Sequence, residues 1–147
     1  MEPQEIPWVC RVFRKIDLFS SLTIAEVGDL VDHMKKYRFP KNEKVVRQGE
    51  RGDSFFIIYK GKVGVRIKKG FFGGSRKVGE LGPEQFFGEM ALLTDDIRTA
   101  TVVAEEDTDC FVLFKGDFQH LIEKNPAFAE MVKQASQRRA FEQKHRQ

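Results

Sequence analysis

The chain contains 147 residues, of which 41% are hydrophobic, and its formal net charge is +3 at pH 7. This length supplies one hydrophobic core, so we expect a single domain over residues 1–147. The mild charge does not indicate a nucleic-acid surface, and no apolar run approaches the roughly 20 residues that span a bilayer. Because the acidic first residues also lack a signal-peptide pattern, the sequence predicts a soluble, cytoplasmic protein.

The first part of the chain, residues 1–36, is expected to be helical. Residues 5–15 are weakly amphipathic. Their expected apolar face comprises Ile6, Val9 and Phe13, followed by Ile16. A second helix opens at Thr23, because Thr23-Ile24-Ala25-Glu26 has the spacing of a capping box, and it should end before Tyr37. Its expected apolar face comprises Ile24, Val27, Leu30, Val31 and Met34.

From residue 37 to 114 the pattern changes to short β-rich runs separated by glycine, proline and aspartate. The expected strands are 44–47, 55–59, 62–67, 77–81, 99–104 and 110–114. Short strands at such regular intervals favour a sandwich or a jelly-roll barrel. Gly49, Gly52, Asp53 and Gly61 are attributed to turns. Phe71-Phe72-Gly73-Gly74 is either a partner-binding tip or the end of a hairpin, and we favour the hairpin.

Helices are expected again over residues 115–147. Asp117 would cap a short helix, and Asn125-Pro126 would end it and begin another, because proline is tolerated at the first helical position. The expected apolar residues of these two helices are Phe118, Leu121, Ile122, Phe128, Met131, Val132 and Ala135. The basic residues beyond Ala135 are explained equally well by a solvated helix face and by a contact with nucleic acid.

Residues 86–101 carry the most informative chemistry. A Gly88-Glu89 pair that opens a helical turn offers backbone N–H groups to an anion. Arg98 follows nine residues after Glu89, where its planar fork could grip two anionic oxygens. A carboxylate would repel that anion unless Glu89 accepts a hydrogen bond from a hydroxyl of the same ligand, such as a ribose 2′-OH. Two other interpretations are less favoured. Arg98 could simply be solvated at the surface, and Glu89 could be a first-turn residue that only interacts with the helix dipole.

Phe87-Gly88-Glu89-Met90-Ala91-Leu92, followed by Arg98-Thr99-Ala100-Thr101, resembles the phosphate-binding cassette of cyclic nucleotide-binding domains. Residues 47–58 and 61–65 are similar to the early strands of that family. The resemblance implies a mainly β fold, a jelly-roll β-barrel over 37–114 with N-terminal and C-terminal helices, and no enzyme activity. It implies phosphate contacts at Arg98, Thr99, Ala91 and Gly88, ribose contacts at Glu89 and Met90, and a base side at Val65 and Val78.

The resemblance indicates the ligand class more firmly than the base. In this family a hydroxyl after the arginine is associated with tolerance of cGMP, yet many cAMP-binding members also carry Ser or Thr there. Thr99 can donate to phosphate in either case. Because Ser or Thr is also common in cAMP-binding members, cAMP is favoured over cGMP. The resemblance also implies a switch in which binding changes the packing of the C-terminal helices and Arg138, Arg139 or Phe141 covers the base.

The sequence does not identify the effector. It contains no kinase, cyclase or phosphodiesterase motif, and it leaves no room for the helix-turn-helix of a catabolite-activator-type transcription factor. We therefore expect either a stand-alone sensor that acts on a partner or one domain of a larger protein. The alternatives are an interaction module with a silent pocket and, less favoured, a cupin-type metalloenzyme. Scattered His33, His120 and His145 and unpaired Cys10 and Cys110 predict no metal and no cofactor.

Overall fold

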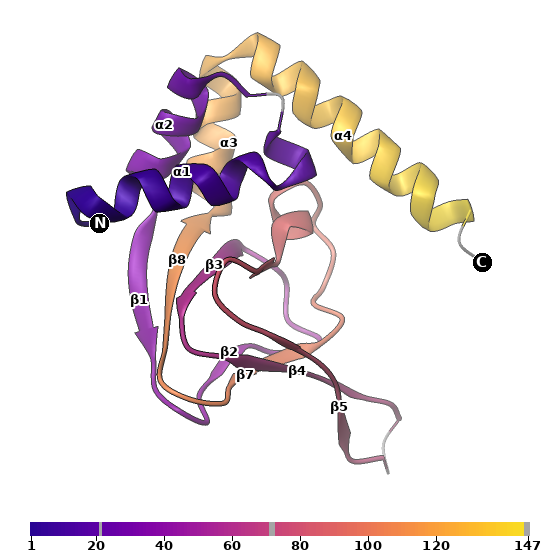
Figure 1. The fold of residues 1–147 in the computed structure, drawn as a ribbon. Helices are drawn as coiled ribbons and strands as arrows, with labels where there is room; N and C mark the ends of the chain where they lie inside the picture. Colours follow the sequence, from indigo (N-terminus) through magenta and orange to yellow (C-terminus); the bar gives the residue numbers. More distant parts are fainter. Residues whose placement is uncertain (21, 71–72, 146–147) are drawn as a thin grey trace. The chain divides into compact units, whose positions relative to one another are not determined.

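The computed structural model describes residues 1–20, 22–70 and 73–145 (Figure 1). It divides into two compact units. The helical unit comprises Met1–His33 and Gly116–Gln147, and the β unit comprises Met34–Lys115.

The helical unit packs around aromatic side chains. Its elements are η1 (Pro3–Glu5), α1 (Ile6–Arg14), η2 (Asp17–Phe19), α2 (Ile24–His33), α3 (Lys115–Lys124) and α4 (Pro126–His145). Phe13 and Phe19 pack edge to face with ring centroids 4.8 Å apart. Phe118 lies edge to face with both Phe19 and Phe128, at 6.3 and 5.7 Å. These buried rings connect the N-terminal helices to the C-terminal ones within one core.

Two predicted helix starts are confirmed by their caps. The N–H of Thr23 donates to Glu26 Oε1 at 2.9 Å, and the N–H of Glu26 donates to Thr23 Oγ1 at 3.2 Å, which completes the capping box. Pro126 is the first residue of α4, and Asn125 Oδ1 accepts the N–H of Phe128 at 3.1 Å.

The predicted apolar faces need two corrections. Ile6 and Ile24 are 39% and 79% exposed, although Val9, Val27 and their helical neighbours are buried. Both isoleucines are first residues of helices, and side chains on a helix lean toward its N-terminus, so these two extend beyond the buried stripe. Asp117 is also not the cap of α3, because that helix begins two residues earlier, at Lys115.

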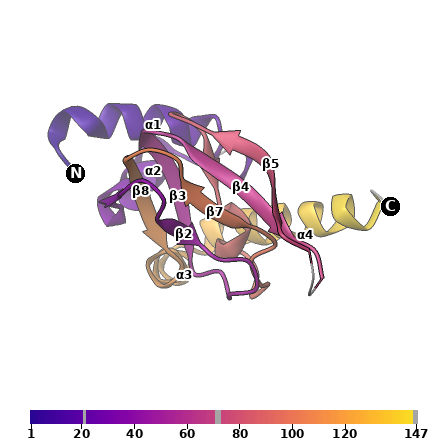
Figure 2. The same cartoon turned by 90° about the horizontal axis from the view of Figure 1, so that it is seen from below.

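The β unit consists of two antiparallel four-stranded sheets, ordered β1-β8-β3-β6 and β2-β7-β4-β5. Figure 2 shows the strands of the second sheet side by side. The strands are β1 (Lys35–Phe39), β2 (Lys44–Val46), β3 (Ser54–Lys60), β4 (Val63–Lys68), β5 (Ser75–Leu81), β6 (Phe86–Phe87), β7 (Thr101–Ala104) and β8 (Thr108–Phe114). The mainly β class is confirmed. The predicted jelly-roll barrel is not, because the two sheets do not close into one, and the arrangement agrees with the sandwich that the strand pattern also allowed.

A core cluster of buried side chains draws on both sheets. Phe56, Ile58 and Val112 come from the first sheet, and Val63 and Val102 come from the second. Phe56 also stacks on Phe87, with centroids 4.7 Å apart and ring planes at 10°. This stacking fixes the point at which β6 leads into the glycine of the cassette, so the core directly positions the candidate site.

Strand β1 was not expected from the sequence. The helix before it ends at His33, and Lys35–Phe39 forms an edge strand paired with β8. Lys35 to Arg38 are exposed, but Lys36-Tyr37-Arg38-Phe39 alternates charged and aromatic residues, and Phe39 packs against the core. This short alternation was missed because the helix before it was expected to continue up to Tyr37. Basic residues are typical of an edge, where they discourage pairing with other chains.

Candidate functional site

The cassette begins with a tight turn that only glycine fits. Gly88 follows β6 with φ of 84° and forms the N-cap of η3 (Glu89–Leu92). A Cβ at this position would lie 2.6 Å from Arg98 Nη1 and 2.9 Å from the carbonyl oxygen of Ser54. Both the left-handed backbone and the space therefore require a residue without a side chain. The predicted neighbourhood of Gly88 and Arg98 is present in the structure.

Neutral groups hold Arg98 in place. Its Nη2 donates to the carbonyl oxygen of Ser54 at 2.7 Å, and its guanidinium carbon lies 5.9 Å from the ring centroid of Phe56. Its backbone N–H donates to Glu50 O at 2.7 Å, and its carbonyl accepts the N–H of Gly49 at 2.9 Å. Arg98 is thus fixed through both its main chain and its side chain.

The charge of Arg98 is half-buried and unneutralised. Burial lowers the pKa of this guanidinium, while the negative charge of Asp53 acts in the opposite direction. Among the described residues, no carboxylate lies within ion-pair distance of it, and its hydrogen bonds all start from Nη2. Nε and Nη1 of the fork are therefore available, on the described chain, to an anionic oxygen pair.

Gly52 is a close-approach glycine as well as part of the predicted turn. A Cβ on Gly52 would lie 2.8 Å from the Cβ of Ala91 and 3.2 Å from Arg98 Nε. The segment from Gly52 to Ser54 therefore packs directly against the cassette. Sequence reasoning assigned this glycine only to turn chemistry and missed Ser54, whose role depends on a backbone carbonyl that any residue possesses.

Lys115 anchors the loop between η3 and Arg98. Its Nζ donates to Thr94 O at 2.5 Å and to Asp95 Oδ1 at 2.6 Å, and its backbone N–H donates to Asp53 O at 2.8 Å. The hydrogen bond from Lys115 lowers the pKa of the Asp95 carboxyl. This lysine could not be identified from sequence, because it lies 17 residues beyond Arg98 and belongs to no motif of the cassette.

The other predicted site residues lie at different depths. Glu89 and Met90 are half-buried in η3, and Ala91 is buried with its N–H bonded to Gly88 O at 3.1 Å. Thr99 is exposed and precedes β7, which begins at Thr101 and not at residue 99 as predicted. The predicted base-side residues are on the β4–β5 hairpin, where Val65 packs against the core and Val78 is 47% exposed at a bulge.

Some predicted features lie outside the described part of the chain. Phe71 and Phe72, within the connection of the β4–β5 hairpin, are among them, as are the side chains of Arg138, Arg139 and Phe141. In the described residues, no group of three His, Cys, Asp or Glu side chains could hold a metal ion. In the same residues, no helix is sufficiently long and apolar to cross a membrane.

The β unit thus combines two antiparallel sheets with a glycine turn against which Arg98 lies. The family model described as a cyclic nucleotide-binding domain matches residues 36–125. The chain belongs to this family, whose members carry a ligand-binding regulatory domain.

Relatives include both eukaryotic and bacterial proteins. The chain is 36% identical over 111 residues to cGMP-dependent protein kinase isozyme 2 forms cD5/T2 of Drosophila melanogaster, covering 74% of this chain and 12% of the kinase. It is 34% identical over 113 residues to the cyclic AMP receptor protein of Thermus thermophilus, covering 76% of this chain and 51% of that protein. The chain thus spans about half or less of the length of these relatives.

A solved structure supports the same fold. The N-terminal domain of a transcriptional regulator from Streptomyces coelicolor A3(2) superposes with a TM-score of 0.78 at 25% identity. The match covers 90% of this chain and 92% of that one.

Proposed function

We propose that the chain binds a cyclic nucleoside monophosphate, with cAMP favoured over cGMP, and acts as a ligand-gated conformational switch. The observation that carries this proposal is the half-buried Arg98 guanidinium, which lies against the Gly88 turn without a carboxylate partner among the described residues. A cyclic phosphate supplies the charge that this arrangement lacks. Because neutral groups already hold the Arg98 guanidinium in place, fixing it on ligand binding costs less free energy.

Each cassette residue has a role in this proposal. Arg98 pairs with the phosphate, the Thr99 hydroxyl donates to it, and the backbone at Gly88 and Ala91 shapes the turn around it. Glu89, with Met90 beside it, accepts a hydrogen bond from the ribose 2′-OH. Val65 and Val78 would form the apolar base side of the pocket.

The choice of base rests on Thr99 and on the relatives. Thr99 is exposed and lies outside β7, so its hydroxyl is accessible to either purine nucleotide. One relative is named for cyclic AMP and another for cGMP. We favour cAMP because a threonine here supports phosphate binding without requiring guanine.

The switch requires that ligand prefers one arrangement of the C-terminal helices, since equal affinity for two arrangements shifts nothing. The proposed output is regulation of a partner protein or of an attached domain. Arg138, Arg139 or Phe141 is proposed to cover the base.

The test is isothermal titration of the chain with cAMP, cGMP and 5′-AMP at one salt concentration and pH. We expect at least micromolar affinity for a cyclic nucleotide, tighter for cAMP, and much weaker binding of the acyclic control. Hydrogen exchange with and without ligand should then show changed protection in α3 and α4. Binding of neither cyclic nucleotide would contradict the proposal and favour an interaction module with a silent pocket.

A further inference from the structure

We propose a second anion-binding site, on the outward face of the β2-β7-β4-β5 sheet, for a phosphomonoester with a compact apolar body. A hollow of about 530 Å³ lies there. Its lining includes the cations Lys44, Arg66 and Lys68, the hydroxyls of Ser75 and Thr101, and the side chain of Val103. The hollow's lining includes neither Arg98 nor the Gly88 turn, although Thr101 is the last residue of the cassette, and the proposal does not depend on the proposed nucleotide function.

Strand alternation places the hollow on the face opposite the core. Along β7, Val102 and Ala104 are buried at 4% and 0% exposure, so Thr101 and Val103 between them point to the other side. All the lining residues come from the second sheet and its connections, whose strands Figure 2 shows side by side. The hollow is therefore built within the β unit alone.

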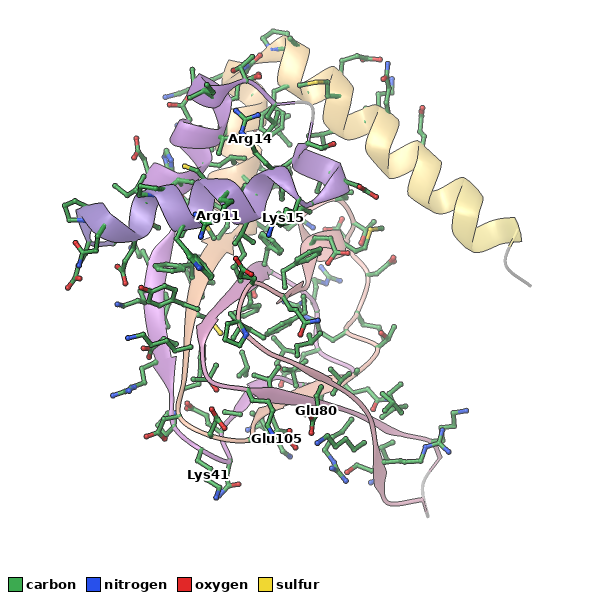
Figure 3. The ribbon with its side chains drawn as sticks, viewed as in Figure 1. Arg11, Arg14, Lys15, Lys41, Glu80 and Glu105 are labelled. Atoms are coloured by element: carbon green, nitrogen blue, oxygen red, sulfur yellow. The ribbon has the colours of Figure 1, made fainter. Side chains whose placement is uncertain are left out.

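The three cations lack counter-charges. None of the hollow's lining residues is acidic, and among the described residues Lys44, Arg66 and Lys68 take part in no ion pair. The carboxylates of Glu80 and Glu105, labelled in Figure 3, are already engaged with Lys77, the register partner of Arg66. Three like charges around one hollow repel each other, so an anion there would lower the electrostatic energy.

The walls of the hollow are fixed in advance. Arg66 donates from Nε to Ser75 Oγ at 2.9 Å and from Nη2 to Ser75 O at 3.1 Å. The Gln48 side chain bonds both backbone groups of Lys68, accepting its N–H at 2.8 Å and donating to its carbonyl at 3.0 Å. The N–H of Gln48 donates to Thr101 Oγ1 at 2.9 Å. Small-molecule sites are usually largely preformed, so these fixed walls are consistent with a ligand site.

The chemistry selects the ligand class. A phosphomonoester carries close to two negative charges at neutral pH and three acceptor oxygens, which suits one guanidinium fork and two flexible ammonium groups. The volume is within the range of roughly 300–1,000 Å³ that is usual for small-molecule sites. Val103 offers an apolar surface, so an ester should bind more tightly than inorganic phosphate.

The test is an NMR titration of ¹⁵N-labelled protein with phenyl phosphate, with phenol as the uncharged control. We expect phenyl phosphate alone to shift the amides around Gln48, Lys68 and Thr101. The double variant Lys44→Gln/Lys68→Gln keeps the Arg66–Ser75 hydrogen bonds, and it should weaken binding by at least about tenfold. Lys35→Gln, an exposed lysine on β1 of the other sheet, is the matched control and should not change it.

Further experiments show where the probe binds and whether the natural ligand is a lipid headgroup or a soluble ester. Binding that disappears in Arg98→Ala but persists in the double variant would place the phosphate at the cassette and overturn the proposal. Equal binding by the double variant and Lys35→Gln would overturn it as well.

Vesicles of phosphatidylcholine with phosphatidic acid carry the same phosphomonoester on a lipid. Binding to them that depends on Lys44 and Lys68 would support the site with a headgroup as its ligand, whereas binding of soluble ester alone would support it with a free metabolite.

Discussion

Two regions of the β unit hold a cation in opposite ways. Lys77, on β5, is exposed and bonded to two carboxylates, those of Glu80 and Glu105, the latter at 2.8 Å. Arg98, in the cassette, is half-buried and is held by the carbonyl oxygen of Ser54. At Lys77 the positive charge is neutralised within the chain, whereas at Arg98 it is positioned by groups without net charge.

The difference indicates what each cation can do. A lysine that already has two carboxylate partners gains little from an added anion, because the anion would have to displace them. An arginine oriented by carbonyl groups keeps its full charge for a ligand, at the cost of partial desolvation. The lowered pKa of Arg98 and the raised pKa of Lys77 record these two situations.

The largest expected effect comes from removing the cassette cation. Arg98→Ala should cost about 2 to 5 kcal/mol of cyclic-nucleotide affinity, because the phosphate loses its charged partner. The fold should survive, since the core cluster does not include Arg98. Calorimetric titration measures the loss. Arg38→Ala, which removes an exposed arginine on the edge strand β1 that pairs with Asp109 on β8, is the control and should bind as the wild type does. Equal affinity in Arg98→Ala would mean that the pocket assignment is wrong.

A change of turn geometry should have the next largest effect. Gly88→Ala forces a side chain into the left-handed region and against Arg98 and Ser54, which should cost about 1 to 3 kcal/mol of unfolding free energy. Nucleotide affinity should fall with it, because Arg98 must move. Gly28→Ala is the control: it lies within α2 and no atom lies within 4 Å of its added Cβ. This variant should gain up to about 1 kcal/mol. Chemical denaturation measures both, and an unchanged Gly88→Ala would contradict the close packing.

Lys115, which anchors the loop, combines both modes, because it donates to one carbonyl and to one carboxylate. Lys115→Met should lose both bonds to the loop and cost about 1 to 2 kcal/mol of unfolding free energy. We also expect faster hydrogen exchange at Thr94 and Asp95. Lys124→Met, an exposed lysine at the end of α3, is the control. If exchange in the loop did not change relative to this control, Lys115 would not be the anchor.

The features that could be predicted from sequence are those set by residue types a few positions apart. The capping box at Thr23, the proline start of α4 and the proximity of Gly88 to Arg98 depend on residue type at short spacing, and all three are present. The cassette could also be identified because its residue types are unusual together. Such local patterns are readable without knowing the tertiary fold.

The missed features depend on groups or partners that sequence does not specify. Ser54 holds Arg98 through a carbonyl that every residue has, and Lys115 reaches Thr94 and Asp95 only after β8 has been placed. Strand β1 alternates charged and aromatic residues over only four positions, directly after a helix that was expected to reach them. The open arrangement of two sheets, instead of a closed barrel, is a property of strand pairing across the whole β unit.

Removing the cation that is neutralised within the chain, Lys77, should have the smallest effect of these changes. Lys77→Met should leave nucleotide affinity unchanged and lower stability only slightly, because exposed ion pairs are well screened by water and salt. The hydrogen bonds that Lys77 donates to Glu105 and, second, to Glu80 raise the pKa of Lys77. Its contribution to stability is therefore complete below the unfolded lysine pKa and disappears as pH rises through the folded one. The bond from Lys77 lowers the pKa of Glu80, whose contribution is present above the unfolded glutamate pKa and is lost as pH falls through the folded one. The difference in unfolding free energy between wild type and variant should therefore be level around neutral pH and shrink toward both extremes. A difference that grew toward either extreme, or any loss of nucleotide affinity, would show that Lys77 is not the self-neutralised counterpart of Arg98.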